Sequence, residues 1–234
     1  MSEFVLKDPN GESEASPPAR AGFVVGTLVH TREGLVPIEK LRRGDWVLSQ
    51  PEIKGELAYR QVVKTFACEE EREVFLLEYF LYHELTARSL VVTGDHPFWV
   101  KDVGWTVIDY LKPARKLELH DGTEACVFKI RKILKTAIAD VGWTRDNGGE
   151  VGPTIDLRDG SIKVEGDSFN QSAFEIDEYL RRPVFNIEVA GFHTYYVGEA
   201  GVWVHNTNCG VNKSPTWFRI QGCSGPLRIS PVWP

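Results

Sequence analysis

The residues of this sequence that could do chemistry on a peptide bond stand near its C-terminal end, as His205, Asn206 and Thr207. The side-chain nitrogen of an asparagine can attack its own backbone carbonyl carbon, which closes a five-membered succinimide and releases the next residue as a free amine. Because Asn206 carries its nucleophile within the same residue, little association entropy remains to be lost, and such tethering reaches effective concentrations on the order of 10⁵ M or more. The pattern therefore predicts cleavage of the Asn206–Thr207 bond.

Histidines elsewhere in the chain could supply the help that this reaction needs. An amide is a weak nucleophile and a peptide nitrogen is a weak leaving group, so the site needs a hydrogen-bond donor at the carbonyl oxygen and a group that moves protons. Histidine can do either near neutral pH, and a donor aimed at a developing oxyanion is worth about 3 kcal/mol. His205 adjoins Asn206, and His193 could reach it across a hairpin.

A further cluster, Thr93-Gly94-Asp95-His96, follows an apolar run. Each of these clusters has a simpler interpretation by itself. Thr93-Gly94-Asp95-His96 would be a tight turn after a strand, His193 would be a core histidine, and Asn206 would be a turn former. The chemical hypothesis therefore requires His96, His193 and His205 to converge beside one amide.

Short strands are the elements that must bring these residues together. Apolar and β-branched runs alternate with Gly, Asp and Pro turns, which predicts an all-β fold with mostly antiparallel pairing. Helix is expected only as a turn or two at Ile38–Leu41 and Val107–Leu111. The predicted strands are Phe23–Thr31, Leu35–Ile38, Trp46–Leu48, Gln61–Ala67, Glu73–Leu81, Ser89–Thr93, Phe98–Lys101, Glu124–Lys132, Val184–Val189, His193–Val197 and Val202–His205.

Three stretches depart from the strand pattern and suggest the domain organisation. Residues 1–20 are polar and are interpreted as a flexible leader, and residues 207–234 are too few to bury a core by themselves. Residues 139–182 are acidic, which predicts a polar, solvated insertion with one weak strand at Ser161–Val164 and no role of its own. The remainder of residues 21–206 is expected to form one domain.

Composition excludes several functional classes. The chain has 27 Lys and Arg against 33 Asp and Glu, a net charge of −6, which argues against a nucleic-acid partner. No apolar run reaches the roughly 18 residues of a membrane span, and residues 1–20 lack the apolar stretch of a signal peptide, so no membrane partner is expected. The localisation stays open, because a secreted parent protein could carry the signal. No C-x-x-C pair occurs, so neither a structural metal nor a cofactor is expected.

The order of the blocks resembles the Hint domain, the self-processing module of inteins and Hedgehog proteins, and most closely the Hint modules that precede the toxins of bacterial polymorphic toxin proteins. The segments that carry the resemblance are Gly22–Thr31, Ile38–Leu41 with Gly44–Val47, Thr93–Phe98, Gly104–Pro113 and Trp203–Thr207. The resemblance implies a pseudo-twofold, horseshoe-like fold of short strands that brings both chain ends to one site.

The resemblance also implies roles for the residues of that site. His96 would activate the upstream scissile peptide, with Thr93 in support, and His193 and His205 would assist the cyclisation of Asn206. Thr207 would be the first residue of the downstream segment and an acyl acceptor.

The sequence departs from the family pattern at the opening nucleophile. The family begins its first block with Cys or Ser, whereas Ala21 or Gly22 stands here, so the N-terminal acyl shift is expected to be disabled. Engineering and natural decay are both compatible with Ala21. Asp95 and Asn186 are the candidates for acid–base help. Related modules often carry Asp where Asn186 stands, and an amide cannot serve as a carboxylate base.

These observations predict a monomer that cleaves, or splices, its own backbone once, with no turnover of an external substrate. Its partners would be its own flanking segments and a parent toxin or delivery protein. A catalytically inactive Hint scaffold between a delivery region and a toxin is the main alternative. A β-rich ligand-binding module with a metal at His96 and His205 is a further alternative, although these histidines do not have a recurrent ligand spacing.

Overall fold

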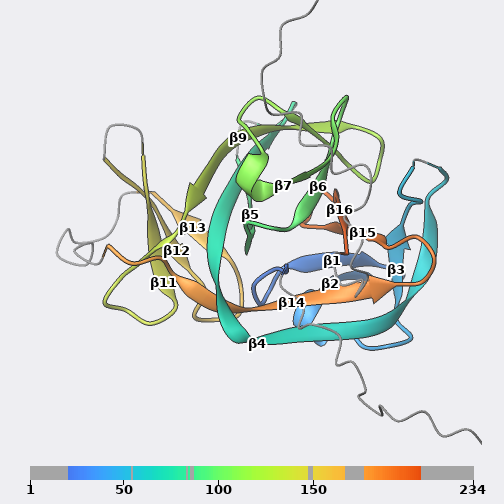
Figure 1. The fold of residues 1–234 in the computed structure, drawn as a ribbon, viewed down its shortest axis with the longest axis horizontal. Coiled ribbons are helices and arrows are strands. Elements are labelled where there is room, and N and C mark those ends of the chain that lie inside the picture. The colour runs from blue at the N-terminus through green and yellow to red at the C-terminus, as the bar shows by residue number, and fades with distance from the viewer. Residues whose placement is uncertain are drawn as a thin grey trace, which may run out of the picture.

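Strands make up most of the computed structural model, which describes residues 21–206 apart from 54, 83, 85–86, 147–149 and 167–176. The strands are β1 (Leu28–Thr31), β2 (Gly34–Pro37), β3 (Trp46–Ser49), β4 (Ala58–Leu81), β5 (Arg88–Thr93), β6 (Pro97–Val100), β7 (Gly104–Val107), β8 (Lys116–Glu118), β9 (Glu124–Lys132), β10 (Leu134–Lys135), β11 (Val141–Arg145), β12 (Val151–Asp156), β13 (Lys163–Glu165), β14 (Arg181–Val189), β15 (Thr194–Val197) and β16 (Val202–His205) (Figure 1). Two single-turn 3-10 helices, η1 (Ile38–Lys40) and η2 (Ile108–Tyr110), occur where short helices are predicted.

A large antiparallel sheet forms the body of the molecule. Its strands follow the order β14-β4-β3-β1-β15-β16-β6-β8-β9, with β2, β5 and β7 paired at its sides. The path closes on itself, because β9 also pairs with β4. The predicted all-β fold with antiparallel pairing is confirmed.

β4 runs through a region where two separate strands are predicted. The charged stretch between Cys68 and Glu73 does not interrupt it, because this part of β4 forms a ribbon with β14. Arg72 lies opposite Arg182, and Glu73 lies opposite Arg181, whose guanidinium is 3.6 Å from the Glu73 carboxylate. The charged side chains can therefore face solvent while the backbone stays paired.

Two copies of one structural unit give the fold its pseudo-twofold character. The first unit is the hairpin β1–β2, the turn η1 and the strand β3, and the second is the hairpin β6–β7, the turn η2 and the strand β8. Equivalent hydrogen bonds recur in both. The Ile38 N–H donates to the Thr27 carbonyl (2.8 Å), as the Ile108 N–H donates to the His96 carbonyl (3.3 Å).

The turn that follows each 3-10 helix is also repeated. The N–H of Gly44 donates to Val62 and the N–H of Ala114 donates to Val127, each at 2.8 Å. Both turn residues have positive φ, 99° at Gly44 and 64° at Ala114. A left-handed conformation is unfavourable for a residue with a Cβ, so the second copy keeps the turn without the glycine that normally eases it.

The acidic segment between residues 139 and 182 corrects the prediction of a solvated loop. Strands β10 to β13 form a separate four-stranded sheet, visible at the left of Figure 1. Val141, Ile155 and Leu157 from this segment are buried, and Ile155 and Leu157 join a hydrophobic cluster with Val24. The acidic residues outnumber the basic ones in this segment, but several of its apolar residues lie at buried positions.

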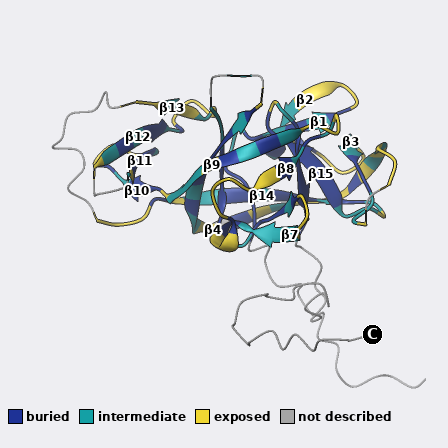
Figure 2. Cartoon of the chain, turned by 90° about the horizontal axis from the view of Figure 1, so that it is seen from above, coloured by how far each residue is buried: buried dark blue, intermediate teal, exposed yellow. Residues whose placement is uncertain are grey.

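The larger hydrophobic cluster lies between the strands that carry the candidate site residues. It contains Val29 of β1, Phe98 of β6, Tyr195 and Val197 of β15, and Val204 of β16, all essentially inaccessible to solvent. Figure 2 shows β15 coloured as buried, with exposed positions on the loops around it. Within the described ranges, no helix has the length and apolar character that crossing a membrane requires.

Candidate functional site

Asn206 follows directly after β16 and is completely buried. Its backbone N–H donates to the carbonyl of His193 (2.8 Å), which extends the pairing of the β15–β16 hairpin by one step. When its amide is oriented to satisfy both ends, Nδ2 donates to the same His193 carbonyl (3.0 Å) and Oδ1 accepts from the Val189 N–H (3.3 Å). The reactive amide of Asn206 is therefore fixed by backbone groups of the loop before β15.

His205 lies at the end of β16, opposite Thr194 of β15. Its Nδ1 contacts the carbonyl oxygen of Asn206, and its Nε2 lies 3.1 Å from Oε1 of Glu52. The ring of Trp105 packs edge-on against it, with centroids 5.1 Å apart. Burial lowers the pKa of His205, and the nearby His193 lowers it further, whereas Glu52 and the contact with the Asn206 carbonyl raise it.

His193 contacts Asn206 through its backbone carbonyl. It adopts a left-handed conformation with φ of 56°, and its N–H donates to Val189 (3.3 Å). Because a left-handed residue other than glycine stores strain, this turn must be stabilised by its surroundings. The result is a carbonyl aimed at both nitrogens of Asn206, while Nδ1 of the ring has no hydrogen-bond partner among the described residues.

At the N-terminal end of the domain, hydrogen bonds also hold the peptide bond between Ala21 and Gly22. The Gly22 N–H donates to Oγ1 of Thr93 (3.0 Å), and the Ala21 carbonyl accepts from Nδ2 of Asn186 (3.1 Å). The Thr93 N–H in turn donates to the Gly22 carbonyl (3.0 Å). Side chains thus contact both the nitrogen and the oxygen of one peptide bond, as a site that polarises that bond would require.

Asn186 has no acid–base capacity in this arrangement, because every part of its amide is engaged. Its Oδ1 accepts from the hydroxyl of Tyr195 (2.8 Å) and from the Ile187 N–H (2.8 Å). Burial raises the pKa of Tyr195 well above its usual value, so this hydroxyl stays protonated as a donor. Asn186 is consequently oriented with its NH₂ group toward Ala21.

His96 is buried against the ring of Phe23, with ring centroids 4.4 Å apart, and neither ring nitrogen has a hydrogen-bond partner among the described residues. Burial lowers the pKa of His96 to about 3, and the charge of His205 contributes in the same direction. Asp95, the adjacent acid–base candidate, lies 3.8 Å from the guanidinium of Arg72, so its ion pair is with β4.

The two junctions are close because one hairpin connects them. Tyr195 of β15 bonds Asn186 at the N-terminal junction, and its neighbour Thr194 pairs with His205 at the C-terminal junction. His96 and His205 also influence each other electrostatically, as do His205 and His193. Thr207 lies outside the described residues.

Glu52 was not among the residues that the sequence singled out. It lies in the loop after β3, far from the His-Asn pair in sequence, and no local motif marks it. The hairpin β1–β2 and its neighbours bring this loop to the end of β15. Only the pairing of distant strands could have identified Glu52 as a neighbour of His205.

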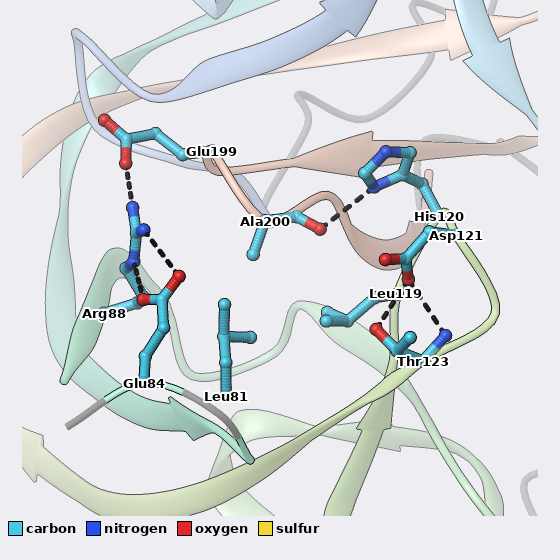
Figure 3. A pocket seen from close by; sticks show the side chains of 9 residues that line it. All are labelled: Leu81, Glu84, Arg88, Leu119, His120, Asp121, Thr123, Glu199 and Ala200. Carbon is cyan, nitrogen blue, oxygen red and sulfur yellow. Dashed lines mark hydrogen bonds and ion pairs between the residues drawn. The ribbon is translucent and has the colours of Figure 1, made fainter. Parts of the chain in front are cut away.

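A pocket of about 210 Å³ lies elsewhere, at the turn end of the β15–β16 hairpin. Figure 3 shows that its charged groups are already paired, with Arg88 between Glu84 and Glu199. His120 uses Nδ1 to contact the Ala200 carbonyl (3.0 Å). No group of three or more His, Cys, Asp or Glu in the described part of the chain is arranged to hold a metal ion.

Comparisons with known proteins find a matching domain family and similar solved structures. The model of the pretoxin Hint domain family matches residues 28–141. A bacterial intein-like domain from Clostridium thermocellum is similar in structure, with 28% sequence identity, a TM-score of 0.50, and coverage of 79% of this chain and 98% of that one. A DnaB intein from Synechocystis sp. PCC 6803 has 16% identity and a TM-score of 0.45, and the alignment covers 80% of this chain and 99% of that one. No curated protein shows significant sequence similarity.

Proposed function

Because residues 28–141 match the pretoxin Hint domain family and the structure is similar to a bacterial intein-like domain, we propose that this chain is a self-processing Hint domain that cleaves its own backbone after Asn206. The observation that carries the proposal is the arrangement of one residue. The Asn206 amide is buried and held by the His193 carbonyl, while the Asn206 carbonyl oxygen contacts His205.

The reaction requires no group from outside the chain. Nδ2 of Asn206 attacks the carbonyl carbon of the same residue, a bond forms between these atoms, and the bond from that carbon to the Thr207 nitrogen breaks. Nδ2 loses one proton and the departing Thr207 amine gains one. The products are a chain that ends in a cyclic imide and a free segment that begins at Thr207.

His205 supports this step at the atom where negative charge develops. Its Nδ1 contacts the carbonyl oxygen that becomes an oxyanion as Nδ2 attacks. A preorganised donor at such an oxygen contributes about 3 kcal/mol to transition-state stabilisation. His193 supports the step by holding Nδ2, and its imidazole, whose Nδ1 has no hydrogen-bond partner among the described residues, is our candidate for the proton transfer.

The N-terminal junction would contribute no acyl shift of its own. Thr93 and Asn186 hold the Ala21–Gly22 peptide, but neither Ala21 nor Gly22 has a side chain that can attack a carbonyl. Complete splicing would then need direct attack by Thr207 on the upstream junction. We therefore propose single-turnover cleavage at the C-terminal junction as the main activity.

A catalytically inactive Hint scaffold is the second candidate, and the missing nucleophile specifically favours it. In that case the domain would only connect an upstream delivery region with a downstream toxin in the parent protein. The two candidates differ in the fate of a single peptide bond.

Incubation of the purified chain at neutral pH, followed by intact-mass measurement, distinguishes the candidates. We expect slow loss of residues 207–234 from the wild-type chain and none from Asn206→Ala. Asn208→Ala is the matched control, because it removes a nearby asparagine from the downstream segment and should leave the cleavage unchanged. An unchanged mass of the wild-type chain over days would overturn the self-processing proposal and favour the scaffold.

A further inference from the structure

We infer that Glu52 is a positioning residue for C-terminal cleavage, which stabilises the doubly protonated form of His205 with Nδ1 directed at the carbonyl oxygen of Asn206. This inference rests on the proposed function, and it adds a residue from a distant loop to the reaction. It begins with the two neighbours of the His205 ring.

Both ring nitrogens of His205 face atoms that can only accept a hydrogen. Nδ1 contacts the backbone carbonyl oxygen of Asn206, and Nε2 lies 3.1 Å from the Glu52 carboxylate. A neutral imidazole has one N–H, so it would direct a lone pair at one of these two oxygens. The imidazolium, with an N–H on each nitrogen, is the protonation state that favours both contacts, the ion pair with Glu52 and the contact with the Asn206 carbonyl.

Glu52 is held next to His205 by a buried set of hydrogen bonds just before it in the chain. The Ser49 hydroxyl donates to the Thr194 carbonyl (2.7 Å), and the Gln50 N–H donates to the Thr194 hydroxyl (3.3 Å). Ser49 and Thr194 are completely buried. Since Thr194 is the strand partner of His205, these bonds fix the start of the loop at the level of the imidazole.

A further bond fixes the side chain of Gln50. Its Oε1 accepts from the hydroxyl of Tyr196 (2.6 Å), whose ring is completely buried. The chain leaves this anchored pair through Pro51, which restricts the backbone, and reaches Glu52 one residue later. The backbone just before Glu52 is therefore fixed next to His205, although about a third of the Glu52 side-chain surface remains exposed.

The charged and titratable groups that face His205 act in opposite directions. Burial among Trp105 and the strands lowers the pKa of His205, as does the charge of His193 in the loop before β15. His96 lies just before β6, and the charges of His96 and His205 repel each other. Glu52 supplies the opposing negative charge. Burial is the largest of these influences and lowers the pKa of His205 below its ordinary value, and without Glu52 this pKa would be lower still.

The chemical consequence concerns the oxyanion. An imidazolium N–H is a stronger donor to a developing negative charge than a neutral N–H, because charge-assisted hydrogen bonds are about twice as strong. Loss of the Glu52 charge should therefore reduce cleavage most at a pH where the wild-type ring is still protonated and the variant ring is not.

The test is the pH dependence of the C-terminal cleavage rate for the wild-type chain and Glu52→Gln. The wild-type rate should fall as the pH rises through the pKa of His205, and the variant should show the same fall at lower pH. We expect cleavage by Glu52→Gln to be about tenfold slower at pH 7.5 and nearly equal to the wild type at pH 5. Glu56→Gln, which removes an exposed carboxylate from the same loop, is the matched control and should follow the wild-type curve.

A second readout does not depend on cleavage. In the Asn206→Ala background, an NMR titration should give a lower pKa for His205 when Glu52→Gln is added. If the wild type cleaves but Glu52→Gln slows it equally at every pH, or the titration is unchanged, the inference is wrong and the proposed function stands. If the wild type does not cleave at all, the proposed function fails, and the titration still decides whether Glu52 holds the charge of His205.

Discussion

Hydrogen bonds hold Ala21 and Gly22 at the N-terminal junction and Asn206 at the C-terminal junction of this domain, yet the two junctions differ in what they can do. At the C-terminal junction Asn206 carries its own nucleophile, and His205 contacts the carbonyl that would be attacked. At the N-terminal junction Thr93 and Asn186 form hydrogen bonds with the Ala21–Gly22 peptide, but no side chain at Ala21 or Gly22 can attack it.

The difference shows which parts of a self-processing site belong to the fold and which do not. Thr93 and Asn186 connect the first residues of the domain to β5, β14 and β15, so their hydrogen bonds also close the core. The surroundings of the N-terminal junction are therefore held by residues of the core and do not require a side chain at Ala21 or Gly22 that could attack the peptide bond.

The largest expected effect at the N-terminal junction comes from Asn186→Asp. The carboxylate would direct an oxygen at the Ala21 carbonyl oxygen in place of the NH₂ group that now donates over 3.1 Å. We expect a loss of about 3 kcal/mol in the free energy of unfolding at pH 8, because a buried charge and an unpaired acceptor are created.

The loss for Asn186→Asp should shrink at pH 5, where a protonated carboxyl can again donate to Ala21. Urea denaturation at both pH values measures it. Equal losses at pH 5 and pH 8 would show that Asn186 does not serve as the donor to this peptide bond.

A smaller effect is expected when a side chain is restored at the N-terminal junction. A Cβ at Gly22 would lie 2.7 Å from the carbonyl oxygen of Phe185 and 3.1 Å from Cβ of Val184. Because the Phe185 oxygen is fixed by the Phe23 N–H (2.9 Å), Gly22→Ala should destabilise the domain by about 2 kcal/mol in urea denaturation.

Gly166→Ala is the matched control for Gly22→Ala, since no described residue lies within 4 Å of its added Cβ and its stability should hardly change. If Gly22→Ala is as stable as the wild type, the junction has kept room for a nucleophile. Its inactivity would then follow from the missing side chain alone.

A more gradual effect, which grows as the pH falls, concerns the imidazole of His96. The pKa of His96 is about 3 in the folded chain, below the ordinary value of 6.5, so only the unfolded chain takes up this proton between these values. Stability should thus be lost as the pH falls below 6.5, by up to about 1.4 kcal/mol per pH unit. His96→Leu should remove this contribution, and parallel curves of unfolding free energy against pH for the two chains would contradict it.

The sequence was sufficient to predict the fold class and most of the residues of the C-terminal junction, because their signals are local. Strand periodicity and turn residues mark β15 and β16, and the succession His205, Asn206 and Thr207 carries its chemistry in its order. The proximity of His193 to Asn206 also follows from a hairpin, the simplest long-range contact.

The residues that sequence could not identify depend on pairing between distant strands. Glu52 reaches His205 through the register of β3, β1 and β15, which no local pattern encodes. The acidic insertion misled the prediction for a related reason, because its charges dominate the composition while Val141 and Ile155 pack inward. The uninterrupted course of β4 likewise depends on its partner β14 rather than on its own residues.

The most direct test of the account is the mass of the larger fragment at the earliest time when cleavage of the wild-type chain can be detected. Attack by Asn206 on its own carbonyl predicts a fragment that ends at Asn206 as a cyclic imide and is lighter by one water molecule than the hydrolysed chain. A fragment that carries a free carboxylate from the first time point, or that ends at another residue, would contradict the account.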